Sequence, residues 1–184
     1  MTTARILDLG QNVALNDLAY GLDDLTVGFG WTITQPSGPQ VEVVPAVMLL
    51  DPAGKAYAPD ALAFHNQLSA GDGAVIVGDD DEQVDLTLSR VPAGVAKLIF
   101  IAFVDPDVRK PGTFDAVTEA YIRLLDRTGA ELLRFTIPTQ PFGSTAVNFG
   151  ELYRYEGAWK FRALGDGYVG GINDIAAKFG FSLS

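Results

Sequence analysis

The densest group of side chains that could do chemistry is a set of acids in the middle of the chain. Asp72 is followed by the continuous run Asp79, Asp80, Asp81 and Glu82, and then by Asp85. Hard cations such as Ca²⁺ prefer several oxygen ligands, and clustered carboxylates with backbone carbonyls from a glycine-containing loop can supply them. The chemistry that these residues indicate is therefore calcium binding.

The acidic run does not have the spacing of an EF-hand loop. Counted from Asp79, the sixth position is Val84 instead of glycine and the twelfth is Arg90 instead of glutamate. Two interpretations stay open. The acids hold one Ca²⁺ in a different arrangement, or the run is a solvated hairpin loop whose like charges repel and keep a sheet edge from pairing.

Side chains for catalysis are scarce. His65 is the single histidine, so a Ser-His-Asp arrangement would have to be built on it. The sequence contains no GxSxG elbow, no GxxxxGK[ST] phosphate loop and no GxGxxG after a strand. We interpret His65, which lies in AFHNQL, as a structural or surface residue.

A second candidate surface is basic. It consists of Arg123, Arg154, Lys160 and Arg162. Lys160 and Arg162 fall on one face of a predicted strand, and Arg154 lies across the turn. We expect these cations to pair with Glu151, Glu156 or the acidic run, in preference to forming an anion site.

Composition limits the classes of partner. The net charge of −10 and the pI near 4.4 disfavour general binding to nucleic acids and adhesion to anionic membranes. The chain has no cysteine, no long apolar run and no basic-then-apolar N-terminus, so the cytosol is the expected compartment. We expect residues 1–184 to form one domain.

Glycine and proline interrupt short apolar runs at regular intervals, a pattern typical of an antiparallel β protein. The predicted strands are Leu25–Ile33, Val41–Leu50, Ala74–Val77, Val84–Leu88, Lys97–Val104, Ala120–Leu125 and Glu131–Ile137. Short helices are predicted near Pro59–Gln67 and Phe114–Ala120. Val41–Leu50 is apolar on both faces, so it should be central or covered on both sides.

The C-terminal stretch predicts a hairpin followed by a helix. Trp159, Phe161 and Ala163 alternate with basic residues after a turn at Glu156-Gly157. Apolar residues then recur with helical spacing and end at a glycine cap. The predicted helical face is Ile172, Ile175, Ala176 and Phe179, with Gly180 as the cap.

The fold class is therefore predicted to be mainly β, a two-sheet antiparallel β-sandwich with a few short helices, including a C-terminal one. Its predicted core includes Trp31, Val47, Leu49, Phe100, Ile122 and Phe161. The terminal helix is expected to cover the mouth of the sandwich.

Several blocks, in order and spacing, resemble the TerD family of tellurium-resistance and stress-response proteins. They are GLDDLTVGFGW at 21–31, GDDDEQVDLTLSRVP at 78–92, GELYR at 150–154, WKFRALG at 159–165 and GYVGG at 167–171. The resemblance implies two packed β-sheets, and it implies assembly with sister Ter-type stress proteins and with a membrane partner near the inner membrane face.

The resemblance also implies a calcium site, from which this chain departs. The early-strand acids of the family correspond to Glu42, which is kept, and Val44, which is not an acid. Thr32 stands where an acid usually follows the tryptophan, and the acidic loop is shortened. The site implied for this chain is Glu42, Asp72, Asp79, Asp80, Asp81 and Glu82. We expect its calcium affinity to be weak or lost.

We interpret the chain as a non-enzymatic, cytoplasmic module that acts through protein–protein interaction in a bacterial stress or tellurite-resistance system, peripheral to the inner membrane through a partner. No nucleic-acid binding and no direct membrane insertion are expected. The alternative is a calcium sensor whose acidic loop controls partner binding. An enzyme on a β-sandwich scaffold is the third and least supported hypothesis.

Overall fold

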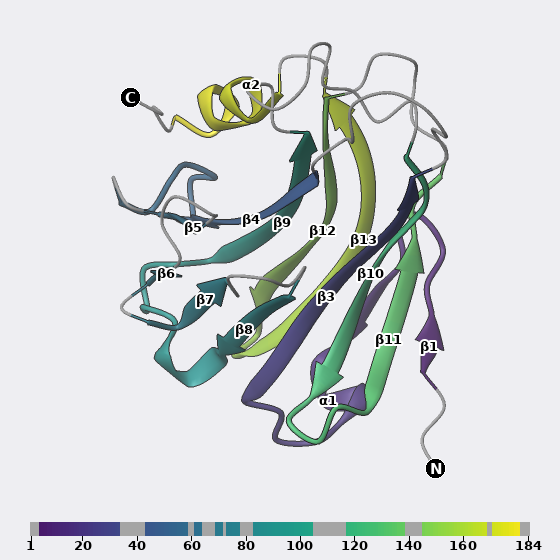
Figure 1. Ribbon diagram of the computed structural model, residues 1–184. Coiled ribbons are helices and arrows are strands. Elements are labelled where there is room, and N and C mark those ends of the chain that lie inside the picture. The colour runs from purple at the N-terminus through teal and green to yellow at the C-terminus, as the bar shows by residue number, and fades with distance from the viewer. Residues whose placement is uncertain are drawn as a thin grey trace.

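Two β-sheets pack face to face in the computed structural model, which describes residues 4–33, 43–58, 61–63, 69–71, 73–77, 83–104, 117–138, 145–168 and 171–180 (Figure 1). Strand pairing is antiparallel except where β1 joins β11. The prediction of a mainly β, two-sheet antiparallel sandwich is confirmed.

The front sheet in Figure 1 has seven strands. In spatial order they are β1 (Arg5–Ile6), β11 (Glu131–Thr136), β10 (Val117–Asp126), β3 (Asp24–Ile33), β8 (Gln83–Thr87), β7 (Val75–Val77) and β6 (Ser69–Ala70). The second sheet has six: β2 (Asn12–Ala14), β13 (Ala158–Tyr168), β12 (Ala146–Tyr155), β9 (Lys97–Val104), β4 (Val43–Leu50) and β5 (Leu62–Ala63).

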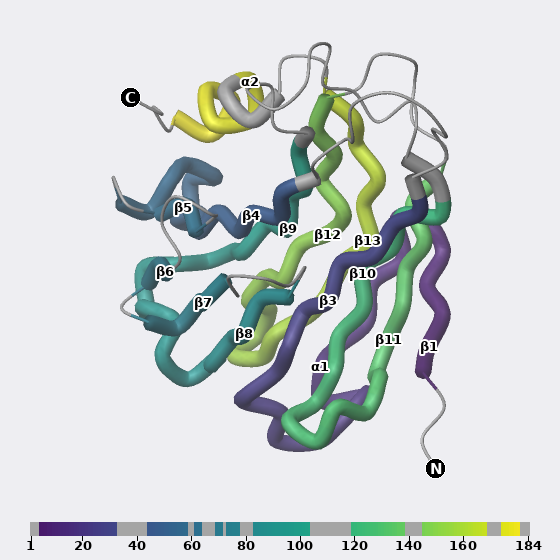
Figure 2. Tube along the Cα trace, viewed as in Figure 1, coloured from purple at the N-terminus to yellow at the C-terminus, as the bar shows by residue number. Residues whose placement is uncertain are grey.

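Three short helical segments complete the described fold. They are α1 (Leu15–Leu18), a 3-10 turn at Leu88–Arg90 and α2 (Gly171–Lys178). In Figure 2, β1 and α2 lie on opposite sides of the molecule. Within the described segments, each helix is too short to span a bilayer.

The main core lies between the sheets, where alternate residues of each strand meet. Val47, Leu49, Phe100, Ile122 and Phe161 have no exposed surface, so five of the six predicted core residues are fully buried. The sixth, Trp31, is partly buried and packs against the same cluster. Phe29 of β3 meets Phe149 of β12 edge to face, with ring centroids 5.4 Å apart, and so joins the two sheets.

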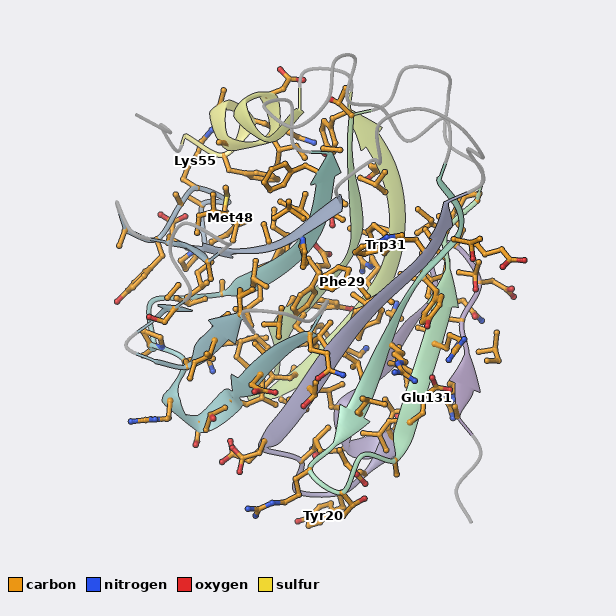
Figure 3. The ribbon with its side chains drawn as sticks, viewed as in Figure 1. Tyr20, Phe29, Trp31, Met48, Lys55 and Glu131 are labelled. Atoms are coloured by element: carbon orange, nitrogen blue, oxygen red, sulfur yellow. The ribbon has the colours of Figure 1, made fainter. Side chains whose placement is uncertain are left out.

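A second apolar cluster lies on the outer face of the six-stranded sheet. Residues of β4 and β9 that point away from the main core pack there against Ile175 and Ala176 of α2. Figure 3 shows Met48 on this side of β4. The prediction that the helix would cover the mouth of the sandwich was wrong, because α2 covers this outer face. The double burial of β4 explains why its sequence is apolar on both faces.

Local conformations agree with the predicted turn and cap. Glu156 and Gly157 both have positive φ, 49° and 80°, as a two-residue hairpin turn requires, and Gly180 has φ 72° beyond the end of α2. The helices predicted near Pro59–Gln67 and Phe114–Ala120 were wrong where the structure describes those stretches. Leu62–Ala63 is strand β5, and β10 begins at Val117.

Candidate functional site

The predicted acidic site falls on residues that the structure does not describe. Glu42, Asp72, Asp79, Asp80, Asp81 and Glu82 all lie outside the described residues, as does His65. The strands that flank the run are described, and Val77 of β7 pairs with Val84 of β8. Residues 78–82 therefore connect two neighbouring antiparallel strands in the chain.

Two described positions bear on whether a calcium ion fits. Val44, which stands where the family pattern has an acid, is 6% exposed and belongs to the apolar cluster beneath α2. Thr32 donates a hydrogen bond from its hydroxyl to the Glu119 carboxylate, at 3.3 Å. Within the described residues, no three histidine, aspartate or glutamate side chains gather to hold a metal. Val44 and Thr32 therefore offer no carboxylate at the two positions where the family pattern has one.

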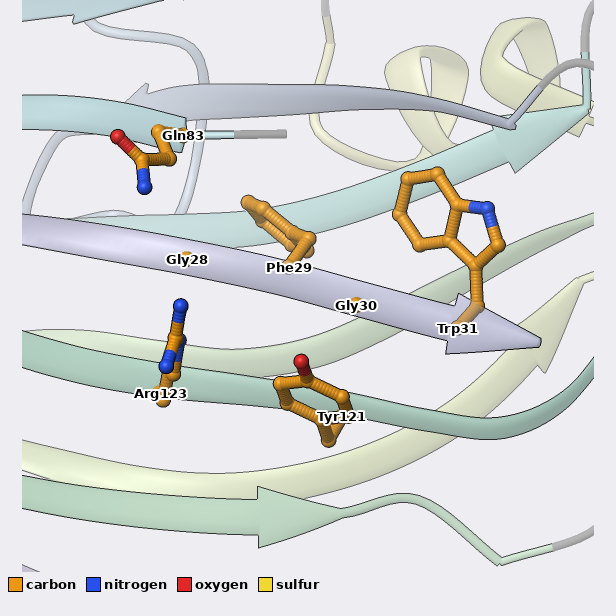
Figure 4. Close-up of a pocket in the computed structure, with 7 residues that line it drawn as sticks. All are labelled: Gly28, Phe29, Gly30, Trp31, Gln83, Tyr121 and Arg123. Carbon is orange, nitrogen blue, oxygen red and sulfur yellow. The ribbon is translucent and has the colours of Figure 1, made fainter. Parts of the chain in front are cut away.

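A polar groove of about 260 Å³ lies on the seven-stranded sheet (Figure 4). It is lined by Gly28, Phe29, Gly30 and Trp31 of β3, Gln83 of β8, and Tyr121 and Arg123 of β10. We call it the glycine groove. It lies where β8 begins, because Gln83, the first residue of β8, pairs with Gly28 while β3 continues to Ile33. Gln83 follows directly on Glu82, so the groove adjoins the end of the acidic run in the chain.

Two glycines create this groove. Tyr121 pairs with Gly30, and Arg123 pairs with Gly28, across the β3–β10 ladder. A Cβ atom on Gly30 would overlap the Tyr121 ring, and one on Gly28 would lie 3.1 Å from Nε of Arg123. The absent side chains therefore let Tyr121 and Arg123 fold across β3.

One carboxylate, that of Glu131, positions two arginine side chains beside the groove. Glu131 accepts two hydrogen bonds from Arg134, at 2.8 and 3.1 Å, and lies 3.6 Å from Arg123. The hydrogen bond to Glu131 is the main reason why the pKa of Arg134 is raised. Arg134 also lies 4.3 Å from the centre of the Tyr121 ring. Arg123 and Arg134 thus place two guanidinium groups around one carboxylate at this edge of the groove, and a guanidinium group can donate to a carboxylate or carbonyl oxygen.

The four predicted basic residues do not form one surface. Arg123 lies at the groove, whereas Lys160 and Arg162 lie on the outer face of the six-stranded sheet. Arg162 pairs with Glu151 at 3.7 Å, as predicted. Arg154 instead donates to the backbone carbonyls of Val91, Pro92 and Val95 and stacks on Trp159. Burial lowers the pKa of Arg154.

Reasoning from the sequence missed most of the groove. Gln83, Tyr121 and Glu131 were not singled out. The available signal was the spacing of Gly28 and Gly30, because two glycines two residues apart leave one side of a strand bare. What they face depends on the pairing with β10, which is not a local property of the sequence.

The chain is similar to known proteins over almost its whole length. The TerD domain model matches residues 4–179. General stress protein 16U of Bacillus subtilis is 37% identical, over 95% of this chain and 96% of that protein. Tellurium resistance protein TerD of Serratia marcescens is 34% identical, over 97% and 98%.

Solved structures have the same fold. A homologue of telluride resistance protein TerD from Streptomyces coelicolor superposes with a TM-score of 0.61, covering 89% of this chain and all of its own, at 20% identity. A crystal structure of a protein of unknown function superposes with a TM-score of 0.66, covering 85% and 95%, also at 20% identity.

Proposed function

The chain belongs to the TerD family, and on that premise we propose that it is a non-enzymatic module that acts through protein–protein interaction in a bacterial stress-response or tellurite-resistance system. Its expected partners are other Ter-type stress proteins and a membrane partner, through which the cytoplasmic chain would act near the inner membrane face.

The observation that supports an interaction role most directly is the glycine groove. Its polar side chains project from three neighbouring strands, β3, β8 and β10, so the backbone positions that carry them are set by the sheet. Arg123 and Gln83 present donors there, and Tyr121 adds an aromatic surface, a combination suited to holding a partner's carbonyl or carboxylate groups.

The interaction role can be tested in the host organism by deleting the gene and restoring it with variants. Wild-type protein should restore growth on tellurite or under oxidative stress. Arg123→Gln removes one guanidinium from the groove and should fail to restore growth, although the protein should fold, because a partly exposed ion pair contributes little to stability. Arg127→Gln, in the exposed turn after β10, is the matched control. Full activity of Arg123→Gln would contradict a role for the groove.

In this proposal the affinity of the chain for calcium is weak or lost. Val44 is committed to the apolar cluster under α2, and Thr32 bonds to Glu119, so neither offers the carboxylate that the family pattern supplies.

Isothermal titration of the chelated protein with Ca²⁺ decides between this proposal and the calcium sensor. We expect binding only in the millimolar range, or none. A dissociation constant near or below about 10 μM would match a sensor site, and the sensor hypothesis would then replace the module hypothesis. Asp79→Asn with Asp81→Asn is the control that assigns any measured heat to the acidic run.

A further inference from the structure

The outer face of the six-stranded sheet has a part that lies beyond the α2 cluster. Its outward side chains are Lys97 of β9, Tyr153 and Tyr155 of β12, and Lys160 and Arg162 of β13, which we call the cation–tyrosine face. Tyr155 is 52% exposed, and the side chains of Lys97 and Arg162 are 39% and 42% exposed. These cations are accessible in a protein whose net charge is −10.

A buried carboxylate at the base of the face forms ion pairs with two of its cations. Glu151 is 7% exposed, and its two oxygens lie 3.3 Å from Nζ of Lys97 and 3.7 Å from Nη1 of Arg162. Glu151 occupies the middle of the ladder, paired with Ile99 on one side and Arg162 on the other. Lys97, Lys160 and Arg162 around this one carboxylate give the face a local excess of positive charge.

The two tyrosine rings contact the charged groups of Lys160 and Arg162. Lys160 places Nζ 4.7 Å from the centre of the Tyr155 ring, and Arg162 places its guanidinium 5.1 Å from the centre of the Tyr153 ring. Side chains that are ordered before binding lose less conformational entropy when a partner arrives. Tyrosine and arginine are also the residue types that protein interfaces favour.

Among the described residues, Glu151 is the one acid that forms ion pairs with the cations of the face. Asp166 lies further along β13, and its charge acts on Lys178 of α2. The pKa of Lys178 is raised, chiefly by the hydrogen bond to Tyr168 and in part by Asp166. Glu156 lies in the hairpin turn. The three cations therefore outnumber the acid that pairs with them, which favours an external anionic ligand.

From these observations we propose that the cation–tyrosine face binds a short acidic segment of a partner protein. Charge complementarity determines the choice of occupant. A membrane or a nucleic acid would face the whole field of a chain with net charge −10, which repels extended anionic surfaces. A short acidic segment meets only the local positive charge, and its methylene groups can pack on the two tyrosine rings. This inference names the chemistry of one partner and rests on the proposed interaction role.

The test uses purified full-length protein and a fluorescein-labelled octaglutamate peptide, followed by fluorescence anisotropy. Wild-type protein should bind the peptide, and binding should weaken between about 20 mM and about 150 mM salt. Lys160→Glu with Arg162→Glu should weaken binding at least about tenfold. Arg90→Glu with Arg127→Glu changes the net charge equally at two exposed positions elsewhere, and should change affinity less than about twofold. Thermal melting checks that both variants fold.

Three results would overturn the proposal. The first is no binding by the wild-type protein. The second is equal weakening in the control variant, because affinity would then follow net charge alone. The third is binding of phosphatidylserine vesicles, or self-association, that depends on Lys160 and Arg162 while the peptide does not bind. If the variant with Lys160→Glu and Arg162→Glu does not fold, the milder substitutions Lys160→Gln and Tyr155→Ala provide the same test.

The failures of the two proposals can be distinguished. If the peptide does not bind while wild-type protein restores growth and Arg123→Gln does not, this inference is wrong and the proposed function stands. If the peptide binds but wild-type protein restores no growth, the face is real as a binding site and the proposed cellular role is wrong.

Discussion

The outer faces of the two sheets differ in the side chains and elements that cover them. On the seven-stranded sheet, Gly28 and Gly30 leave β3 bare, and side chains of β10 fold into the space, so the surface is a polar groove. On the six-stranded sheet, α2 covers β4 and β9, and charged and tyrosine side chains cover the rest.

This difference shows two ways in which a sandwich can carry function. The glycine groove is made by removing side chains, so its shape depends on neighbours that can move. The cation–tyrosine face is made by adding side chains that are held by a buried carboxylate and by aromatic rings. We therefore expect substitutions in β3, beneath the groove, to destabilise the protein less than substitutions in the six-stranded sheet. Four experiments test this difference.

Truncation after Gly170 should have the largest effect. It removes α2, which is fixed to the turn after β4 by a hydrogen bond from the amide of Ala56 to the carbonyl of Phe179, at 2.8 Å. The outward residues of β4 and β9 would then be exposed as one apolar patch, and we expect aggregation. Light scattering and thermal melting measure it. A soluble truncation with an unchanged melting temperature would mean that α2 is not needed to cover this face.

Phe161→Ala should be the most destabilising of the point substitutions considered. Phe161 is fully buried on the inner side of β13, between the two outward residues Lys160 and Arg162. Loss of a buried phenylalanine side chain costs about 3–5 kcal/mol in the free energy of unfolding. Urea denaturation measures this change, and Trp31→Phe, at a partly buried core position, is the milder comparison. A loss below about 1 kcal/mol would show that the inner side of β13 is loosely packed.

Much of the architecture could be predicted from local patterns. Lys97–Val104 was predicted with the bounds that β9 has, and the hairpin turn at Glu156-Gly157 was predicted from its residue types. Periodicity also indicated that β4 is buried on both sides. It could not say that α2 provides the second cover, because that depends on contacts between elements that are distant in the sequence.

The sites were harder to predict than the fold, for the same reason. Arg154 resembles other surface cations in the sequence, yet the structure directs it to three backbone carbonyls. The glycine groove requires the register that sets Tyr121 opposite Gly30. The acidic site stays a prediction, because its residues lie outside the described part of the chain.

Two glycine substitutions compare the sheets directly. At Gly150, an added Cβ would lie 2.5 Å from the Phe161 ring and 2.9 Å from the carbonyl oxygen of Arg162, which cannot move easily. Gly150→Ala should therefore cost about 1–3 kcal/mol. At Gly30 the obstacle is the end of the Tyr121 side chain, which can swing away, so Gly30→Ala should cost less than about 1 kcal/mol.

A double-mutant cycle tests the explanation for Gly30. In a Tyr121→Ala background the obstacle is gone, and Gly30→Ala should become stabilising by about 0.5–1 kcal/mol, because alanine loses less backbone entropy than glycine on folding. Denaturation of the four proteins gives the coupling energy. If the cost of Gly30→Ala is the same in both backgrounds, or exceeds that of Gly150→Ala, Tyr121 is not the movable neighbour inferred here.

The smallest expected effect compares two turns, one from each sheet. Asp126, before the β10–β11 turn, accepts hydrogen bonds from the amides of Thr128 and Ala130 and from the Thr128 hydroxyl. These bonds, the hydroxyl first, lower the pKa of Asp126 below its ordinary value. Asp51, after β4, accepts from two backbone amides, those of Ala53 and Lys55.

Asp126→Asn keeps an oxygen in place but removes the charge, so it should lower stability modestly at neutral pH. Because the pKa of Asp126 is lower in the folded state, its contribution is present above the ordinary aspartate range and is lost as the pH falls through the folded-state pKa. Urea denaturation across a pH series should show wild type and Asp126→Asn converging in acid. Asp51→Asn, which has no hydroxyl donor to lose, should change stability less. A difference for Asp126→Asn that persists unchanged at acid pH would mean that hydrogen-bond geometry, and not the carboxylate charge, stabilises this turn.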